Sequence, residues 1–305
     1  MRETKKLRRP IVMLNVTEDC QLRCKHCYNT SGGLKHATPA DLQERTVKVA
    51  RAAGAINFTG GEPFLVPELP ELLKISHAHG VDNIITSNGL LVDEALLDQI
   101  TPHVYMLKIG MMGATPTTND FIRGRGHFKT AIKALDLMAG YDFVSCMKVS
   151  LDRHNMDEIE AFCQVALEHG VDQLVFGQLV NQGRASKMLQ DLLLTHLDLQ
   201  QVQEELTRVK EKYWGQLKIA KHCTLSGLCE EAGHFYTVTS TGAMAPCLMR
   251  EDLAGGNIAT VDVKEMMAMV DFFGRGRHHS SVKDLEVAKP RFWSGKTIRL
   301  PSTPS

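Results

Sequence analysis

Three cysteines that stand close together are the residues whose type and spacing suit metal chemistry. Cys20, Cys24 and Cys27 follow one another in the order CxxxCxxC. Structural zinc sites usually take four ligands, often from two CxxC pairs, and iron-sulfur cubanes also normally take four thiolates. Three thiols in one loop therefore predict a multinuclear centre that leaves one iron open, with zinc as the alternative.

The other cysteines of the chain fall into two kinds. Cys223, Cys229 and Cys247 form a second group towards the far end, whereas Cys146 and Cys163 stand apart from both groups. Because thiols stay reduced in the cytoplasm, metal binding or catalysis is a better expectation for grouped cysteines than disulfide bonds. Cys163 lies on the apolar stripe of an expected helix, so we expect it to pack in the core.

The composition is that of a water-soluble globular protein and excludes several function classes. The 305 residues include 35 Lys and Arg against 35 Asp and Glu, and 43% are hydrophobic. Zero net charge argues against a nucleic acid or another polyanion as partner. The apolar run at 11–14 after the basic start is too short for a signal peptide or a membrane span. We expect a cytoplasmic protein without a membrane partner.

Short β-branched runs alternate with amphipathic stretches from residue 11 to residue 179. The expected strands are 11–16, 56–59, 83–86, 104–109, 143–151 and 174–179. The expected helices are 39–53, 68–79, 93–100, 128–139 and 155–169. This alternation predicts an α/β fold with a parallel sheet and right-handed crossovers, either open or curled into a partial barrel.

Three polar or glycine-rich motifs follow the first three expected strands. They are the cysteine triplet, Gly60-Gly61-Glu62-Pro63 and Ser87-Asn88-Gly89. In parallel sheets, ligands bind at the carboxyl ends of the strands. We therefore expect all three motifs on one rim of the sheet.

The alternation stops after residue 184, and 195–213 has the pattern of a long helix with a polar face. Short strands and turns follow, and the end of the chain is rich in basic, Pro, Ser and Thr residues. The expected parts are a core at 1–190, a linking helix at 191–216, a small α+β domain at 217–275 and a tail at 276–305.

The cysteine loop together with Thr59-Gly60-Gly61-Glu62-Pro63 resembles the radical SAM superfamily over residues 11–185. The resemblance implies a partial (β/α)6 TIM-like barrel with a [4Fe-4S] cluster on Cys20, Cys24 and Cys27. The open iron would bind S-adenosylmethionine, and an electron from a flavodoxin or ferredoxin type of donor would cleave it. The resulting 5′-deoxyadenosyl radical would abstract hydrogen from a C–H bond of the substrate.

The resemblance also implies residues that contact S-adenosylmethionine. Gly60 and Gly61 would let main-chain groups approach its methionine moiety, and Glu62 would accept a hydrogen bond from its ammonium group. Ser87 and Asn88 would contact the ribose or the methionine. The alternative for these residues is ordinary turn chemistry.

Further expected contacts come from the cysteine loop and the fifth strand. His26 occupies a position where family members often carry an aromatic residue beside adenine. Cys146 and Lys148 share one strand face, which should line the barrel. Lys148 is then a candidate partner for the methionine carboxylate, or a lysine that reaches solvent, and Cys146 is a candidate hydrogen donor, or a packed thiol. Gly110 and Met112 depart from the polar residues that the family commonly has after the fourth strand.

The second cysteine group resembles the first half of a SPASM extension, or the shorter Twitch extension, of radical SAM enzymes. Five residues separate Cys223 from Cys229, and Gly242 precedes Cys247 by the spacing Gly-x4-Cys. The resemblance implies an auxiliary [4Fe-4S] cluster. Only three thiolates are available, so the fourth ligand would be the substrate, an open site or a histidine. The candidate histidines are His234, His278 and His279. Zinc or plain packing is the alternative.

The resemblance favours maturation of a ribosomally made peptide as the function. The first strand begins at residue 11, so we expect no N-terminal peptide-recognition domain and a separate recognition partner or direct binding in the barrel. The alternative is a dehydrogenase or epimerase of a sugar or another small biosynthetic intermediate. A non-catalytic iron-sulfur redox protein would explain the thiolates but not the motif at 60–63.

Overall fold

The computed structural model of the chain describes residues 10–29, 37–225, 235–246, 254 and 256–267. The strands are β1 (Ile11–Thr17), β2 (Ala55–Gly60), β3 (Asp82–Ser87), β4 (Met106–Met111), β5 (Val144–Leu151), β6 (Gln173–Gln178), β7 (Lys218–Lys221), β8 (Phe235–Val238), β9 (Ala243–Ala245) and β10 (Gly256–Asn257). None of the helices in these segments is both long and apolar enough to span a bilayer.

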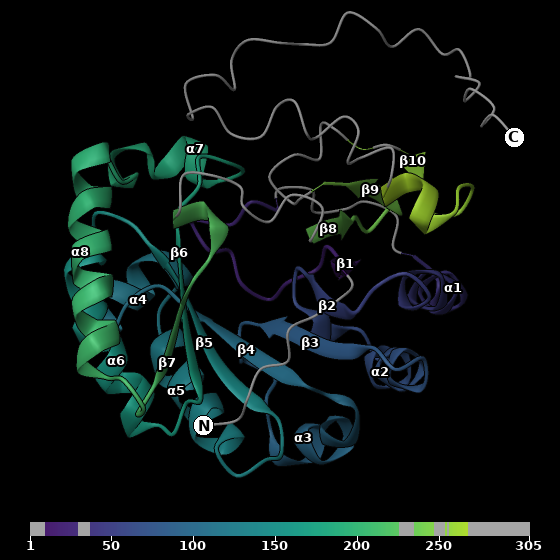
Figure 1. Cartoon of the computed structure of the whole chain (residues 1–305), viewed down its shortest axis with the longest axis horizontal. Coiled ribbons are helices and arrows are strands. Elements are labelled where there is room, and N and C mark those ends of the chain that lie inside the picture. The colour runs from purple at the N-terminus through teal and green to yellow at the C-terminus, as the bar shows by residue number, and fades with distance from the viewer. Residues whose placement is uncertain (1–9, 30–36, 226–234, 247–253, 255, 268–305) are drawn as a thin grey trace, which may run out of the picture.

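The helices lie on the outside of the curved sheet, as Figure 1 shows. The α-helices are α1 (Pro39–Ala50), α2 (Leu69–Ala78), α3 (Glu94–Ile100), α4 (Pro116–Arg123), α5 (His127–Met138), α6 (Ile159–Glu168), α7 (Ala185–Met188) and α8 (His196–Lys212). The short 3-10 helices are η1 (Pro63–Leu65), η2 (Thr101–His103), η3 (Met156–Glu158), η4 (Gln190–Leu192) and η5 (Cys223–Leu225).

The described strands form one sheet in the order β10-β9-β8-β1-β2-β3-β4-β5-β6-β7. All pairings from β8 to β7 are parallel, and β9 and β10 add antiparallel strands at one edge. Six of these strands are the six that the sequence predicted, and their carboxyl ends share one rim. The prediction of an α/β partial barrel is confirmed.

Side chains on the two faces of the strands build two separate cores. The larger core fills the space between the sheet and the helices and includes Phe58 and Phe176. The smaller core packs the inner face near the amino ends of the strands, where Ile84 pairs with Met106 and Met106 pairs with Val144. The strands thus alternate between an inner and an outer face, as a barrel requires.

Helix α4 was not among the expected helices. Its N-cap is Thr115, whose hydroxyl accepts a hydrogen bond from the Thr118 amide, and Thr118 reaches back to the Thr115 amide. Together with Pro116 in the first turn, this arrangement is a capping box with a favoured first residue. The signal was present in the sequence, in a segment for which neither a helix nor a strand was predicted.

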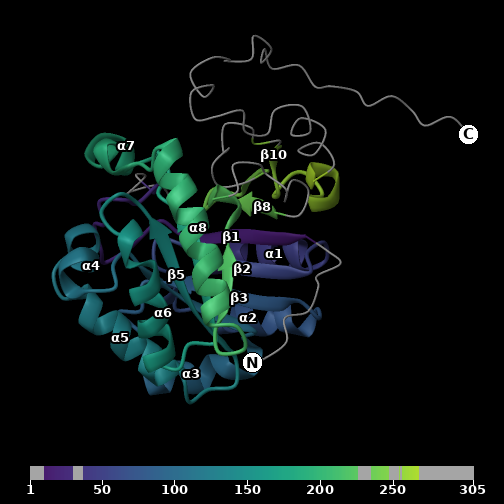
Figure 2. The ribbon, with the colours of Figure 1, turned by 60° about the vertical axis from the view of Figure 1, so that its left-hand side comes forward.

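The strands predicted for a separate second domain continue the barrel sheet. Strand β7 pairs in parallel with β6, and β8 pairs in parallel with β1, with Ile11 opposite Phe235. Figure 2 shows β8 next to β1, on the side away from β2. The division of the chain into a core, a linking helix, a second domain and a tail stays a prediction.

Candidate functional site

The cysteine loop that follows β1 is held by the segment that follows β6. The Arg184 Nε donates to the Cys24 carbonyl at 2.8 Å, and the Arg184 amide donates to the Cys27 carbonyl at 2.9 Å. Its Nη1 also donates to the Asn29 carbonyl at 3.2 Å. Gly183, at φ +57°, lies so close to this loop that a Cβ there would overlap the loop backbone. The first and sixth strands thus position the loop jointly.

The end of α4 holds the loop from another side. The Lys25 amide donates to the Ile122 carbonyl at 2.9 Å, and the Cys24 thiol lies 3.8 Å from the Arg123 carbonyl. The Arg123 guanidinium passes over Gly110 of β4, where a Cβ would overlap it, and its Nε is buried without a partner within the described residues. The departure from the family pattern at position 110 therefore makes room for an arginine.

Gly60 and Gly61 bring the loop after β2 against the loop after β1. The Gly61 amide donates to the Thr17 carbonyl at 2.7 Å, and the Glu62 amide donates to the Asp19 carbonyl at 2.7 Å. A Cβ on Gly60 would overlap the Thr17 carbonyl oxygen, and a Cβ on Gly61 the Asp19 carbonyl oxygen. These glycines are required for the close approach of two chain segments, a role that the sequence interpretation missed.

Glu62 is fully buried and ties β2 to the loop after β3. Its Oε1 accepts from the Ser87 hydroxyl at 2.8 Å and from the Phe64 amide at 3.2 Å, and its Oε2 accepts from the Asn88 amide at 2.8 Å. Burial raises the pKa of this carboxyl, against the opposing effect of the hydrogen bonds. A carboxylate offers about four acceptor positions, so three chain donors leave about one for a ligand.

Asn88 links this network to the cysteines and to a histidine that the sequence interpretation did not single out. Its Nδ2 lies 3.6 Å from the Cys20 Sγ, and its carbonyl lies 3.0 Å from the His127 Nε2. The Asn119 Nδ2 lies 3.0 Å from the other ring nitrogen, Nδ1. Burial lowers the pKa of His127 to about 4, so the ring is neutral. These bonds fit the tautomer in which Nδ1 accepts and Nε2 donates.

His26 lies in the cysteine loop, close to three cationic side chains. Burial lowers the pKa of His26 well below its ordinary value, and the charges of Arg123, Lys148 and Arg184 lower it further. The His26 Nδ1 is buried and has no hydrogen-bond partner within the described residues. Lys148 lies opposite Gly110 in the register of β5 with β4. The structure thus brings Lys148 close to His26 of the cysteine loop. The ligand that each of these side chains contacts stays a prediction.

Cys146 lies well below the rim. It is fully buried in the inner apolar core, and burial raises the pKa of its thiol to about 11. It precedes the last residue of β5, Leu151, by five positions, or about 17 Å of strand at 3.3 Å per residue. The hydrogen-donor role of Cys146 stays a prediction, and Cys163 is buried in the outer core as expected for packing.

The cysteine loop offers the donor set of an iron-sulfur cluster. Cys24 is 7% exposed, and burial raises the pKa of the Cys20 and Cys27 thiols. Within the described segments, no three His, Cys, Asp or Glu side chains are arranged to hold a single metal ion. Thiolates from one loop that its neighbours hold in place fit a cluster with a polar ligand beside it, because the nearby buried nitrogens of His26 and Arg123 have no partner among the described residues.

The second cysteine group falls outside the part of the chain that can be described. The helix η5 begins at Cys223, whose side chain is not described, and Cys229 and Cys247 lie outside the described residues. The candidate histidine ligands also lie outside them, namely His234, His278 and His279. The auxiliary cluster site on this chain therefore stays a prediction.

Comparison with known families decides the affiliation. The family described as the Radical SAM superfamily matches residues 14–166, which is half of the chain. The chain belongs to the radical SAM superfamily. Radical SAM enzymes bind a [4Fe-4S] cluster together with S-adenosylmethionine, and relatives with SPASM-type extensions carry additional clusters. The predictions of the family and of a [4Fe-4S] cluster that binds together with S-adenosylmethionine are confirmed, and the auxiliary cluster of this chain stays a prediction.

Two curated relatives of this radical SAM chain have names that indicate different reactions. The chain is 27% identical over 210 residues to Fe-coproporphyrin III synthase of Methanosarcina barkeri. The aligned residues make up 67% of this chain and 52% of that protein. It is 29% identical over 185 residues to mycofactocin maturase MftC of Mycobacterium tuberculosis, with coverage of 58% and 46%. The chain thus spans about half the length of these relatives.

A solved structure shares the fold of this radical SAM chain. Streptococcus suis SuiB bound to precursor peptide SuiA superimposes with a TM-score of 0.71 at 15% identity, over 85% of this chain and 64% of that one. At this level of identity the likeness concerns the fold alone. It agrees with the partial barrel described above.

Proposed function

We propose that this chain reductively cleaves S-adenosylmethionine and uses the 5′-deoxyadenosyl radical to abstract hydrogen from a ribosomally made peptide during its maturation. The observation that carries the proposal is the cysteine loop, held against Gly60-Gly61-Glu62 at the carboxyl ends of the strands. The cluster, when bound by Cys20, Cys24 and Cys27, supplies the electron that cleaves the carbon-sulfur bond.

The surrounding residues of the chain orient S-adenosylmethionine in this proposal. The remaining acceptor position of Glu62 suits the methionine ammonium, and Ser87 and Asn88 hold that carboxylate in place. Lys148 is the proposed partner of the methionine carboxylate. His26, neutral because its pKa is lowered by burial, provides an uncharged ring for adenine.

The comparisons support a peptide as substrate without excluding a small molecule. MftC is a maturase by name, and SuiB was solved with a precursor peptide. Fe-coproporphyrin III synthase supports the alternative of a small biosynthetic intermediate, acted on by a dehydrogenase or epimerase. In either case a low-potential donor of the flavodoxin or ferredoxin type would deliver the electron.

The test is an anaerobic reaction with the reconstituted protein, S-adenosylmethionine and dithionite. We expect 5′-deoxyadenosine, and a mass change in a short peptide encoded next to the gene of this protein. A changed sugar or other small molecule with an unchanged peptide would contradict the peptide substrate. If no 5′-deoxyadenosine formed with a strong reductant and any of the candidate substrates, the chain would be a redox protein rather than a radical enzyme.

The proposed auxiliary cluster predicts the iron content. Two [4Fe-4S] clusters require about eight irons per chain after anaerobic reconstitution. A variant in which Cys223, Cys229 and Cys247 are all replaced by alanine should keep about four, because Cys20, Cys24 and Cys27 are intact. If the parent protein already contained about four irons and its second cysteine group reacted freely with iodoacetamide, the auxiliary cluster would be absent.

A further inference from the structure

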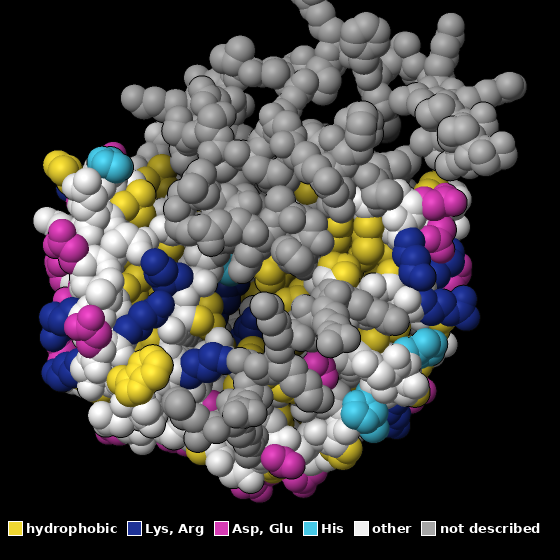
Figure 3. All heavy atoms as spheres, viewed as in Figure 1, with side chains coloured by type: hydrophobic (Ala, Val, Ile, Leu, Met, Phe, Trp, Pro, Cys, Tyr) yellow, Lys and Arg dark blue, Asp and Glu magenta, His cyan; other side chains and the backbone are white. Residues whose placement is uncertain are grey.

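His127 lies at the candidate site with its ring almost fully buried. It is the first residue of α5 and is 3% exposed, unlike the His side chains that Figure 3 shows on the surface. The Asp120 carboxylate accepts hydrogen bonds from the Gly126 amide at 2.6 Å and from the Phe128 amide at 2.8 Å. An anion at this position stabilises the start of a helix. Asp120 thus fixes the backbone that carries His127.

The neighbouring Asn119 amide fixes which ring nitrogen of His127 carries the proton. The Met112 amide can only donate, and it donates to the Asn119 Oδ1 at 3.0 Å. The Asn119 Nδ2 therefore faces the Asp120 Oδ1 and the His127 Nδ1, each at 3.0 Å. Because an amide nitrogen only donates, the His127 Nδ1 accepts and its Nε2 carries the hydrogen.

The Nε2 of His127 donates to the Asn88 carbonyl at 3.0 Å. Asn88 is 6% exposed, so water has little access to this carbonyl. A buried carbonyl that loses its partner costs the free energy of its desolvation. Without the His127 donor, the loop after β3 would have to shift to give this carbonyl another partner.

The same loop supports the Glu62 carboxylate. The Asn88 amide donates to the Glu62 Oε2 at 2.8 Å, and the Ser87 hydroxyl donates to the Oε1 at 2.8 Å. Two of the three chain donors to this carboxylate therefore come from residues 87 and 88. A shift of the loop would move both donors relative to Glu62.

We propose that His127 is a positioning residue for S-adenosylmethionine. Its Nε2 holds the loop after β3, and this loop holds the Glu62 carboxylate where the methionine ammonium binds. The inference rests on the proposed function, in which Glu62 accepts a hydrogen bond from that ammonium group. His127 acts through Asn88, as a supporting residue that keeps a binding group in its productive geometry.

Two substitutions at His127 separate its two hydrogen bonds. In His127→Gln, the terminal amide reaches about as far as the imidazole Nε2 and keeps a donor to Asn88. In His127→Asn, the shorter side chain ends near the place of Nδ1, so it keeps an acceptor for Asn119 but no donor to Asn88. We expect His127→Asn to raise the Kd for S-adenosylmethionine at least about tenfold, and His127→Gln to raise it less than about threefold.

The Kd is measured by equilibrium dialysis of the anaerobically reconstituted full chain with labelled S-adenosylmethionine, without reductant, so that the ligand is not cleaved. The rate of 5′-deoxyadenosine formation with dithionite then gives KM and kcat. In His127→Asn we expect KM for S-adenosylmethionine to rise while kcat changes less than about threefold, because the lost interaction acts on ligand binding. Circular dichroism and iron content show whether the variants are folded and carry the cluster.

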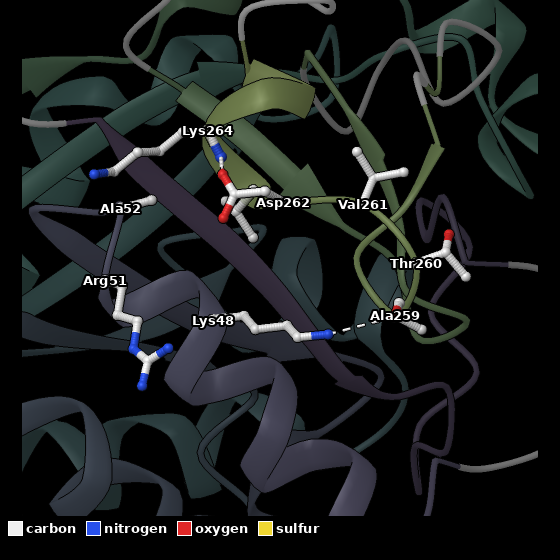
Figure 4. Close-up of a pocket in the computed structure, with 9 residues that line it drawn as sticks. Lys48, Arg51, Ala52, Ala259, Thr260, Val261, Asp262 and Lys264 are labelled. Carbon is white, nitrogen blue, oxygen red and sulfur yellow. Dashed lines mark hydrogen bonds between the residues drawn. The ribbon is translucent and has the colours of Figure 1, made fainter.

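Two control variants remove hydrogen bonds elsewhere in the barrel. Asn83 is 1% exposed near the amino end of β3, where its Nδ2 donates to the Leu73 carbonyl at 2.7 Å and to the His103 carbonyl at 2.8 Å. Lys48 lines a hollow of about 280 Å³ beside α1 and reaches the Ala259 carbonyl, 3.4 Å away (Figure 4). Asn83→Ala and Lys48→Gln should lower the midpoint of urea unfolding and leave the Kd for S-adenosylmethionine unchanged.

Three results would overturn the proposal. The first is binding of S-adenosylmethionine by folded His127→Asn as tight as that of the parent. The second is equal weakening by His127→Gln, which would show that the shape of the ring matters rather than its donor. The third is equal weakening by Asn83→Ala, which would show a general loosening of the barrel.

The parent protein separates this inference from the proposed function. A parent that binds S-adenosylmethionine but leaves the peptide unchanged would contradict the peptide substrate alone, and the variants would still decide the role of His127. A parent that does not bind S-adenosylmethionine would contradict both.

Discussion

Replacing Cys24 by alanine is expected to reduce the formation of 5′-deoxyadenosine to the level seen without enzyme. Cys24 is the middle thiol of the triplet, buried between the Arg184 contacts and the end of α4. With two thiolates left on the loop, a [4Fe-4S] cluster loses one of its three protein ligands. The measurements are iron content, the visible absorbance of the cluster, and 5′-deoxyadenosine after reduction with dithionite.

Cys163→Ala is the matched control for this change. Cys163 is also a buried thiol, but it packs in the outer core between sheet and helices. We expect this variant to retain the cluster of the cysteine loop and to cleave S-adenosylmethionine. It should lose some stability, because the missing sulfur atom leaves a small cavity in the core. Full cleavage activity in Cys24→Ala would contradict the assignment of this loop as the cluster site.

Replacing Gly61 by alanine is expected to destabilise the site by about 1–3 kcal/mol or more, as overpacking does. The added methyl group would overlap the Asp19 carbonyl, so the loops after β1 and β2 would have to separate. The hydrogen bond from the Glu62 amide to that carbonyl would be lost or lengthened. We expect a lower midpoint of urea unfolding and a lower iron content after reconstitution.

Gly140→Ala separates the steric cause from a general effect of losing glycine. Gly140 follows α5, and neither glycine has the left-handed φ that would disfavour alanine. A Cβ on Gly140 would meet its nearest neighbour, the Leu137 carbonyl oxygen, at 3.7 Å, an ordinary contact. The unfolding midpoint of this variant should therefore not fall. Equal unfolding midpoints and iron contents for both variants would show that the close approach of Gly61 to the Asp19 carbonyl is not needed for stability or for cluster assembly.

The sequence was sufficient for the parts of the site that follow from strand order. The alternation of strands and helices predicted that the cysteine loop, the motif at 60–63 and the motif at 87–89 would meet at one rim, and they do. Parallel topology alone guarantees this meeting, because each loop leaves its strand at the same edge.

Contacts between distant segments could not be predicted in this way. No local pattern indicates that Arg123 passes over Gly110, or that His127 bonds to the Asn88 carbonyl. Such contacts depend on how each crossover helix is placed on the sheet. The pairing of β8 with β1 was missed for the same reason, since nothing near residue 235 distinguishes a strand of the barrel from one of a separate domain.

The pairing of β8 with β1 also has a consequence for the order of folding. Strand β1 leads directly into the cysteine loop, yet one of its edges is completed by residues about 220 positions later in the chain. Until that segment has been synthesised, β1 exposes an unpaired edge that can pair with other chains. Such long-range contacts slow folding. Chains that stop before residue 235 should therefore aggregate during synthesis. The cysteine loop should reach its final position only after this segment has paired with β1, late in folding.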